Sequence, residues 1–196
     1  MSVPAKTIPA IERSFTYADY QSWELAPGER YELIYGQAFA MAAPNAYHQS
    51  ILMELSRQMA NYFLGKPCKV YPAPYDVRLF YADGGASEQD HTVVQPDLSV
   101  VCDPRKRAPE GCRGAPDLVV EILSPGNSAI EMERKFELYR TAGVREYWVI
   151  DPEHQILHAY RFEGDQIFTR SFSRYDTAAV DSFPGLSITL DPVFAE

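Results

Sequence analysis

The stretch that decides the fold is Asp-Leu-Val-Val-Glu-Ile-Leu at residues 117–123, which is followed by a helix-forming segment and by Glu-Tyr-Trp-Val-Ile-Asp at residues 146–151. The first run is apolar on both faces of an extended chain except at Glu121, which predicts a strand buried inside a sheet. Ser128 and Glu131 form a capping-box pattern at the start of the helix-forming segment. A strand, a helix and a strand in this order favour a right-handed crossover between parallel strands.

The segments on either side of this unit complete an α+β pattern. Two β-prone runs around Gly36 predict a hairpin over residues 30–41, and apolar residues at helical spacing predict a helix over residues 47–64. A short helix over residues 17–25 is expected to begin at the cap residue Thr16. Further strands are expected at 69–71, 75–80, 97–102, 155–162 and 166–172, the last two forming a C-terminal β-meander, with a basic loop at 103–115. The sequence therefore predicts an α+β fold of α/β-like character, with a mixed central β-sheet flanked by helices.

Length and composition limit the class of protein. The chain has 196 residues, of which 46% are hydrophobic and 23% are charged. This suits a single domain over residues 15–196, preceded by a flexible N-terminal arm at 1–14. Because no apolar run is long enough to span a membrane and the first residues lack a signal-peptide core, a cytoplasmic protein is expected. The three cysteines, Cys68, Cys102 and Cys112, form no CxxC pair and are expected to be reduced thiols.

The net charge of −9 argues against a protein that coats nucleic acid non-specifically, because phosphate binding needs cationic side chains. The acidic excess is unevenly distributed along the chain. Residues 97–145 contain eight acidic and eight basic side chains, so the remaining 19 acidic and 10 basic residues carry the whole excess. A divalent metal ion bound within the neutral segment would make its local charge positive. The charge pattern is therefore compatible with weak, metal-dependent and salt-sensitive binding to DNA.

Three charged residues fall at positions that the pattern marks as buried. Asp97 begins one apolar strand and Glu121 lies within another, where an ionised carboxylate is costly unless a cation compensates it. At about 100° per residue, Lys135 falls within the apolar arc of its helix, whereas Arg134 is expected to point elsewhere. Lys135 could therefore reach the same cleft as the two carboxylates.

Two carboxylates and a lysine suit the hydrolysis of phosphodiesters. Carboxylate oxygens bind Mg²⁺, and a lysine can position water and stabilise negative charge that develops on phosphorus. Each residue also has a purely structural alternative. Asp97 could cap a turn, Glu121 could pair with a buried cation, and Lys135 could extend to solvent or pair with Glu131. The spacing alone leaves these alternatives open.

A longer set of motifs resembles the bacterial Uma-two family. The matching segments, in chain order, are residues 31–36, His48, 95–98, 115–125, 135–139, 142–144 and 146–152. That family is similar to the restriction-endonuclease-like PD-(D/E)XK phosphodiesterases. The resemblance therefore implies a restriction-endonuclease-like core, cleavage of DNA that depends on Mg²⁺ or Mn²⁺, and a homodimer. It places Asp97 at the PD aspartate and Glu121 at the acidic position of the (D/E)XK element, which implies that both bind the metal.

The resemblance departs from the superfamily pattern at the lysine, because Leu123 stands two residues after Glu121. The family likeness implies that Lys135, on the following helix, takes the role of that lysine. It also matches Glu32 to an additional acidic position that supports the site. Two alternatives belong to other classes of function. One is a catalytically inactive, nuclease-like protein that binds nucleic acid or regulates; the other is a glycosidase with paired carboxylates, in which Lys135 would have no task.

Overall fold

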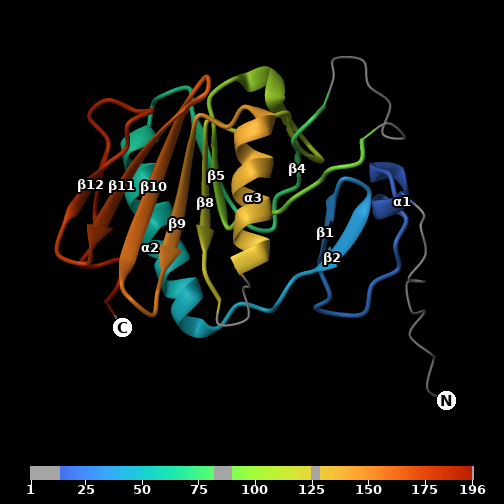
Figure 1. Cartoon of the computed structure of the whole chain (residues 1–196), viewed down its shortest axis with the longest axis horizontal. Helices are drawn as coiled ribbons and strands as arrows, with labels where there is room; N and C mark the ends of the chain where they lie inside the picture. Colours follow the sequence, from blue (N-terminus) through green and yellow to red (C-terminus); the bar gives the residue numbers. More distant parts are fainter. Residues whose placement is uncertain (1–13, 82–89, 125–128, 196) are drawn as a thin grey trace.

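The computed structural model describes residues 14–81, 90–124 and 129–195. Its centre is a six-stranded sheet in which β8 and β9 are parallel and all other neighbours are antiparallel (Figure 1). In spatial order the strands are β11 (Gln166–Ser173), β10 (Ile156–Glu163), β9 (Glu146–Asp151), β8 (Leu118–Ile122), β5 (Leu98–Val101) and β3 (Lys69–Pro72). The mixed α+β fold is confirmed, and the expected C-terminal meander is formed by β10 and β11, which continue the central sheet.

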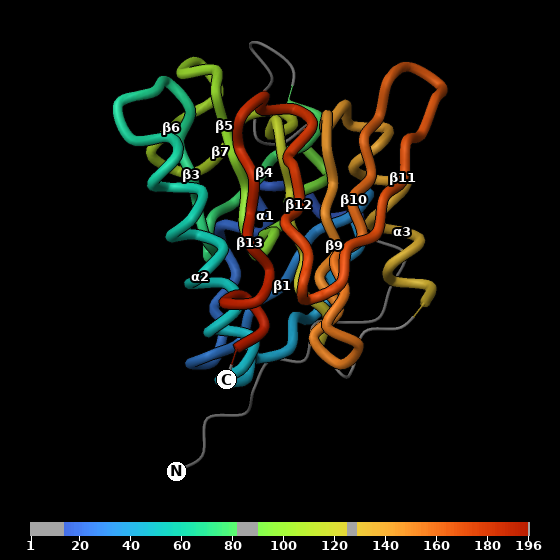
Figure 2. The backbone as a smooth tube through the Cα atoms, turned by 90° about the vertical axis from the view of Figure 1, so that its left-hand side faces the viewer, coloured from blue at the N-terminus to red at the C-terminus, as the bar shows by residue number. Residues whose placement is uncertain are grey.

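The two long helices cover opposite faces of this sheet, as Figure 2 shows edge-on. Residues of α2 (Ala46–Phe63) pack against Leu118, Val120 and Ile122 of β8, whereas residues of α3 (Ala129–Ala142) share a separate apolar cluster with Val119. Since successive residues of a strand point to opposite faces, Glu121 lies on the α3 face with Val119. The hairpin of β12 (Thr177–Ala179) and β13 (Ser187–Thr189) adds to the α2 side of the core. Every residue of β8 is buried, as its unbroken apolar pattern predicted.

The strand–helix–strand unit forms as expected, with α3 connecting the parallel strands β8 and β9. Gly143 follows the helix with a φ of +87°, a conformation that favours glycine at a helix end. The expected capping residue Ser128 and almost all of the expected N-terminal arm lie outside the described residues.

The N-terminal hairpin, β1 (Tyr31–Ile34) and β2 (Gln37–Ala40), also forms where the sequence predicted it. It is tied to the chain ahead of β5, because Leu33 and Val93 exchange two backbone hydrogen bonds of 2.7 Å. The helix before it, α1 (Tyr17–Gln21), is capped by Thr16 as expected but ends four residues early. The chain turns there because the hydroxyl of Ser22 donates to the Asp19 carbonyl, and Trp23 then packs on neighbouring aromatic rings.

The expected basic loop at 103–115 contains short elements that the sequence did not suggest. They are a 3₁₀ turn, η2 (Pro104–Lys106), and the strands β6 (Arg107–Ala108) and β7 (Gly111–Arg113). Strand β7 pairs in parallel with β4 (Val77–Arg78), which is all that forms of the longer strand expected at 75–80. The expectation was wrong because the partner that supplies the hydrogen bonds lies more than 30 residues away in the sequence.

Two of the three cysteines form a disulfide, Cys68–Cys102, so the expectation of three reduced thiols is wrong for this pair. The antiparallel register pairs Lys69 of β3 with Val101 of β5, which sets Cys68 opposite Cys102 just beyond the paired residues. Cysteine spacing cannot show this, since the two residues are 34 apart and meet only through the sheet. Cys112 is free and buried.

We predict that the purified, oxidised protein, unfolded without a reductant, takes up one alkylating group per chain, and three after reduction. Because the disulfide closes a long loop, its reduction should lower the free energy of unfolding by about 3 kcal/mol. Mass spectrometry after iodoacetamide treatment measures the first quantity and urea titration the second. Three adducts in the absence of reductant would contradict the pairing.

Candidate functional site

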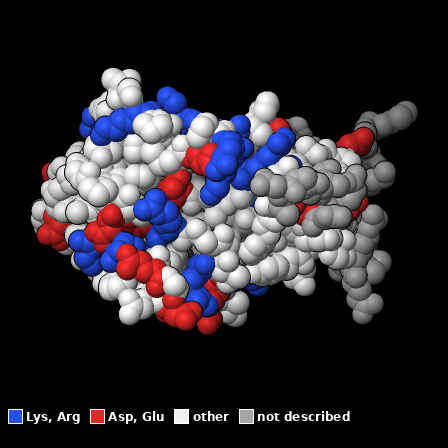
Figure 3. Space-filling view, turned by 90° about the horizontal axis from the view of Figure 1, so that it is seen from above, with Lys and Arg blue, Asp and Glu red and all other residues white. Residues whose placement is uncertain are grey.

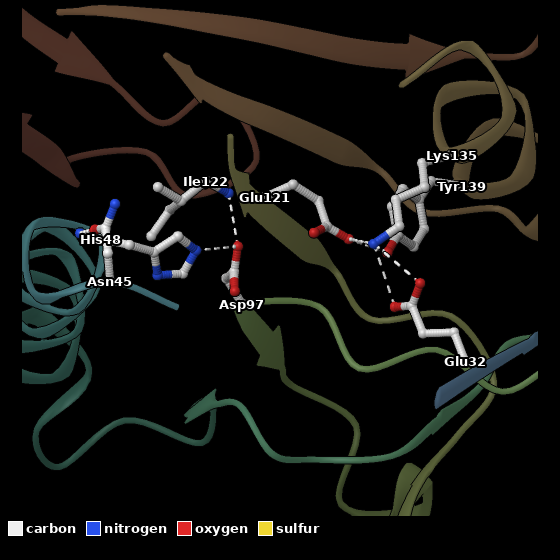
Figure 4. Close-up of polar contacts among 8 residues, drawn as sticks. All are labelled: Glu32, Asn45, His48, Asp97, Glu121, Ile122, Lys135 and Tyr139. Atoms are coloured by element: carbon white, nitrogen blue, oxygen red, sulfur yellow. Dashed lines mark hydrogen bonds and ion pairs between the residues drawn. The ribbon is translucent and has the colours of Figure 1, made fainter. Parts of the chain in front are cut away.

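Asp97 and Glu121 lie side by side because their strands are neighbours in the sheet. The antiparallel register of β5 and β8 pairs Leu98 with Val120, so the next pair along is Asp97 and Glu121 (Figure 4). The carboxylate of Asp97 accepts the backbone N–H of Ile122 at 2.7 Å through Oδ2. Among the described residues, His48 also contacts this carboxylate, and it does so at the same oxygen, Oδ2. The Oδ1 atom of Asp97 is therefore the oxygen best placed to accept a further ligand.

Lys135 connects two of the acidic residues. Its Nζ atom lies 3.0 Å from Oε1 of Glu121 and 3.1 Å from Oε2 of Glu32. The helical-angle prediction for Lys135 is thus confirmed: the side chain is only 9% exposed and does not extend to solvent. Glu32 comes from β1, where its Oε1 also accepts the backbone N–H of Gln95 at 3.0 Å. The structure therefore brings all four residues singled out by the sequence to one place.

The cluster has more negative than positive charge. Asp97, Glu121 and Glu32 contribute three carboxylates and Lys135 one ammonium, a formal sum of −3 + 1 = −2 before His48 is considered. Burial, with the nearby charges of Asp97 and Glu32, raises the pKa of Glu121 although Lys135 opposes the shift. Burial alone would lower the pKa of Lys135, but Glu121 and Glu32 outweigh it and raise that pKa. The ammonium is therefore held charged while one carboxylate remains poorly compensated.

Two further residues contact the cluster, and the sequence gave neither of them a role. The Tyr139 hydroxyl, one helical turn after Lys135, donates to Oε1 of Glu121 at 2.5 Å. His48, near the start of α2, lies with Nε2 at 3.2 Å from Oδ2 of Asp97. Burial by itself lowers the pKa of His48, but the hydrogen bond and charge of Asp97 reverse the shift and raise it. The spacing of four residues between Lys135 and Tyr139 was the available signal for the tyrosine, because residues four apart lie on the same face of a helix.

A cavity of about 420 Å³ opens over these side chains. The hairpin forms one wall with side chains from alternate positions of its two strands, and the start of α3 forms another. Arg134 lines this cavity, which corrects the expectation that it points elsewhere. It lies at the edge of the inward arc of α3, and its long side chain places the guanidinium 4.3 Å from the centroid of the Phe39 ring.

The donor set fits a hard divalent cation. Mg²⁺ and Mn²⁺ prefer carboxylate oxygens and retain water, so two protein carboxylates are enough for such a site. A charge of +2 would balance the cluster charge of −2. Within the ranges that the structure describes, no group of three His, Cys, Asp or Glu side chains is arranged to hold a metal ion by itself. Asp97 and Glu121 would therefore need water or substrate oxygens as additional ligands.

The fold and the buried carboxylate–lysine cluster define a nuclease-like α+β protein. A family model described as "Uma2: Putative restriction endonuclease" matches residues 17–191, and the chain belongs to this family. The family assignment agrees with the resemblance found in the sequence motifs.

The chain is also similar to individual proteins. Two uncharacterized proteins of Synechocystis sp. are 28% and 25% identical to the chain. The first match covers 90% of this chain and 89% of the relative, and the second 81% and 87%. A crystal structure described as "a putative nuclease belonging to DUF820" from Anabaena variabilis superposes with a TM-score of 0.71 at 21% identity, covering 92% of this chain and 97% of the other. None of the helices in the described ranges is long and apolar enough to cross a membrane.

Proposed function

We propose that the protein is a metal-dependent DNA endonuclease that hydrolyses phosphodiester bonds. The observation that carries the proposal is the buried cluster in which Glu121 and Glu32 pair with the ammonium of Lys135, while Asp97 lies beside Glu121 and lines the same cavity. Asp97 and Glu121 would hold Mg²⁺ or Mn²⁺. When bound, such a cation polarises a phosphoryl oxygen and promotes deprotonation of water.

The remaining residues have distinct roles in this proposal. An ammonium has three N–H donors; those of Lys135 that point to Glu121 and Glu32 fix its position, and a further donor can reach an incoming water or phosphate oxygen. Glu32 orients Lys135 and is itself fixed by the backbone of Gln95. Tyr139 and His48 hold Glu121 and Asp97 in place. We extend the proposal to a homodimer, which the family likeness implies, and to action in the cytoplasm, which the sequence analysis led us to expect.

A second candidate function is a nuclease-like protein without catalytic activity that binds nucleic acid or regulates. The specific observation in its favour is that Lys135 is already engaged by two carboxylates, a pairing that would also suit a purely structural ion cluster. The two candidates differ in what a divalent metal does, because only the enzyme needs it for a chemical step.

The proposal predicts that supercoiled plasmid is nicked, and circular single-stranded DNA is cut, when Mg²⁺ or Mn²⁺ is added, with no product in EDTA. Circular substrates are chosen because only internal cleavage can open them. Gel electrophoresis of both substrates over time provides the measurement, and a preparation of the Glu121→Gln variant purified in parallel controls for contaminating nucleases. Intact circles of both kinds with either metal would contradict catalysis and favour the second candidate.

A further inference from the structure

The cavity wall formed by the hairpin has a regular composition. Glu32 of β1 pairs with Phe39 of β2, and two positions further along, just outside both strands, the backbone N–H of Met41 donates to the carbonyl of Arg30. Side chains at alternate positions of paired strands share a face. Arg30, Glu32, Phe39 and Met41 accordingly all line the cavity. The same face thus carries a catalytic-site carboxylate in its middle and an aromatic ring and a guanidinium around it.

Arg134 and Phe39 form a stacked pair at the cavity. The guanidinium carbon of Arg134 lies 4.3 Å from the ring centroid, and both side chains are partly exposed. In the portion of the chain that the structure describes, no carboxylate forms an ion pair with Arg134 or Arg30. Guanidinium planes and aromatic rings are surfaces on which unpaired bases stack, and an arginine without a carboxylate partner can bind a backbone phosphate.

The side chains of the cluster are largely buried beneath the cavity. The side chains of Glu32, Lys135 and Glu121 are 5%, 9% and 10% exposed. The cavity above them has a volume of about 420 Å³, within the range of pockets that hold a small molecule. An unpaired nucleotide can enter a pocket of this size, because its base is not held in a duplex stack.

The surface gives little support to binding of an extended duplex. Affinity for duplex DNA comes mainly from many cationic contacts with phosphates. The chain carries a net charge of −9, and even on the face opposite the cavity, which Figure 3 shows, acidic side chains lie among the basic ones. Arg30 and Arg134 line the cavity, where each can contact a phosphate or a base of a bound strand.

We propose that the cavity selects an unpaired DNA strand, with one base stacked on the Arg134–Phe39 pair and a neighbouring phosphate bound by Arg30. This inference rests on the proposed function, because it assumes that the reacting phosphate lies at Asp97 and Glu121. It identifies the substrate class as single-stranded DNA, including the unpaired segments of supercoiled, frayed or flapped duplexes. Phe39 and Arg134 are the residues that determine this specificity.

The test is equilibrium binding of a fluorescent single strand of about 15 nucleotides, a length within the range that single-strand sites cover. Fluorescence anisotropy in Ca²⁺, a cation used in place of Mg²⁺ to prevent turnover, compares this strand with the same sequence as a duplex. We expect the single strand to bind at least about tenfold more tightly, and Arg134→Ala to weaken its binding about tenfold. The matched control is Arg140→Ala on the same helix, because Arg140 is paired with Glu137 and does not line the cavity.

Two further variants separate stacking from charge. Arg134→Lys keeps the positive charge but loses the planar group, so it should bind the single strand as weakly as Arg134→Ala does. Phe39→Leu keeps an apolar side chain under the guanidinium and should weaken binding several-fold while the protein still unfolds at the same temperature. Equal affinity for single strand and duplex, or wild-type binding by Arg134→Lys, would overturn the inference. If both DNA forms were cleaved and both bound with equal affinity, the inference about single strands would fail while the nuclease proposal stood. The inference and the nuclease proposal can therefore fail separately.

Discussion

Replacing Glu121 by Gln is expected to lower the rate of DNA cleavage by about 100- to 1,000-fold or more, as the loss of a group that stabilises the reacting charge does in other enzymes. The substitution preserves the shape of the side chain and an oxygen that can accept from Lys135 and Tyr139. It removes the negative charge that would bind a divalent cation. Asp97→Asn should have a similar effect, because its Oδ2 contacts can persist while the charge is lost.

Initial rates on plasmid and on circular single-stranded DNA at saturating Mg²⁺ measure this effect. Glu137→Gln is the matched control, since Glu137 lies on α3, pairs with Arg140 and is half-exposed. The rate of the control should remain within about twofold of the wild type, as for a surface substitution. Cleavage by Glu121→Gln at the control rate would rule out a metal-binding role for Glu121.

Measuring the stability of the Glu121→Gln variant at two pH values distinguishes a loss of activity from a loss of folding. The pKa of Glu121 is raised in the folded protein, so the folded chain binds its proton more tightly than the unfolded chain. Ionising Glu121 therefore lowers the free energy of unfolding. This loss is absent at acidic pH and grows as the pH rises above the pKa of Glu121 in the unfolded chain, near 4.5. Without metal at pH 8, Glu121→Gln should be at least as stable as the wild type, with a smaller difference at pH 5. Added Mn²⁺ should raise the unfolding temperature of the wild type only.

Replacing Lys135 by Met is expected to destabilise the protein by about 3–5 kcal/mol at pH 8, because it leaves two buried carboxylates without their cation. The Met side chain fills similar space, so the effect reports charge more than packing. As the pH falls, Glu121, whose pKa is raised mainly by burial, takes up a proton, and the loss of stability should shrink. Urea titration at pH 8 and pH 5 measures the free energy of unfolding at both conditions.

A compensated variant tests the physical reason for this loss. Combining Lys135→Met with Glu32→Gln and Glu121→Gln removes all three charges, and it should recover most of the stability lost by Lys135→Met alone. Arg140→Met on the exposed side of the same helix should change stability by less than about 0.5 kcal/mol. A loss for Lys135→Met as small as that of Arg140→Met would mean that Lys135 extends to solvent in solution.

Local patterns in the sequence were sufficient for the elements that carry the site. The unbroken apolar run around Glu121 predicted a strand buried on both faces, and the helical angle of Lys135 predicted a buried lysine; both are confirmed. These predictions succeeded because periodicity and burial are properties of consecutive residues. The apolar strand pattern also singled out Asp97, and the motif resemblance added Glu32, which no periodicity could connect to Glu121 from a position 89 residues away.

Other features depended on partners that are distant in the sequence. The strand pairing of β7 with β4, the Cys68–Cys102 disulfide and the contact of His48 with Asp97 each join segments separated by more than 30 residues. Arg134 was assigned to the wrong side because an angle on a helix describes where a side chain starts and not how far it extends. Its contact with Phe39 exists only because the hairpin packs beside α3.

The sequence by itself determined the strand–helix–strand unit, the hairpin, the inward position of Lys135 and the family assignment. Each of these depends on consecutive residues or on motifs that follow one another in a fixed order. Only the tertiary structure decided that Glu32 and Glu121 share the ammonium of Lys135 and that Tyr139 and His48 contact Glu121 and Asp97. It also decided that Arg30, Phe39 and Arg134 line one cavity over these residues. The physical reason is that charge balance and cavity shape are set by distances between elements, which depend on how the sheet, the hairpin and α3 pack together.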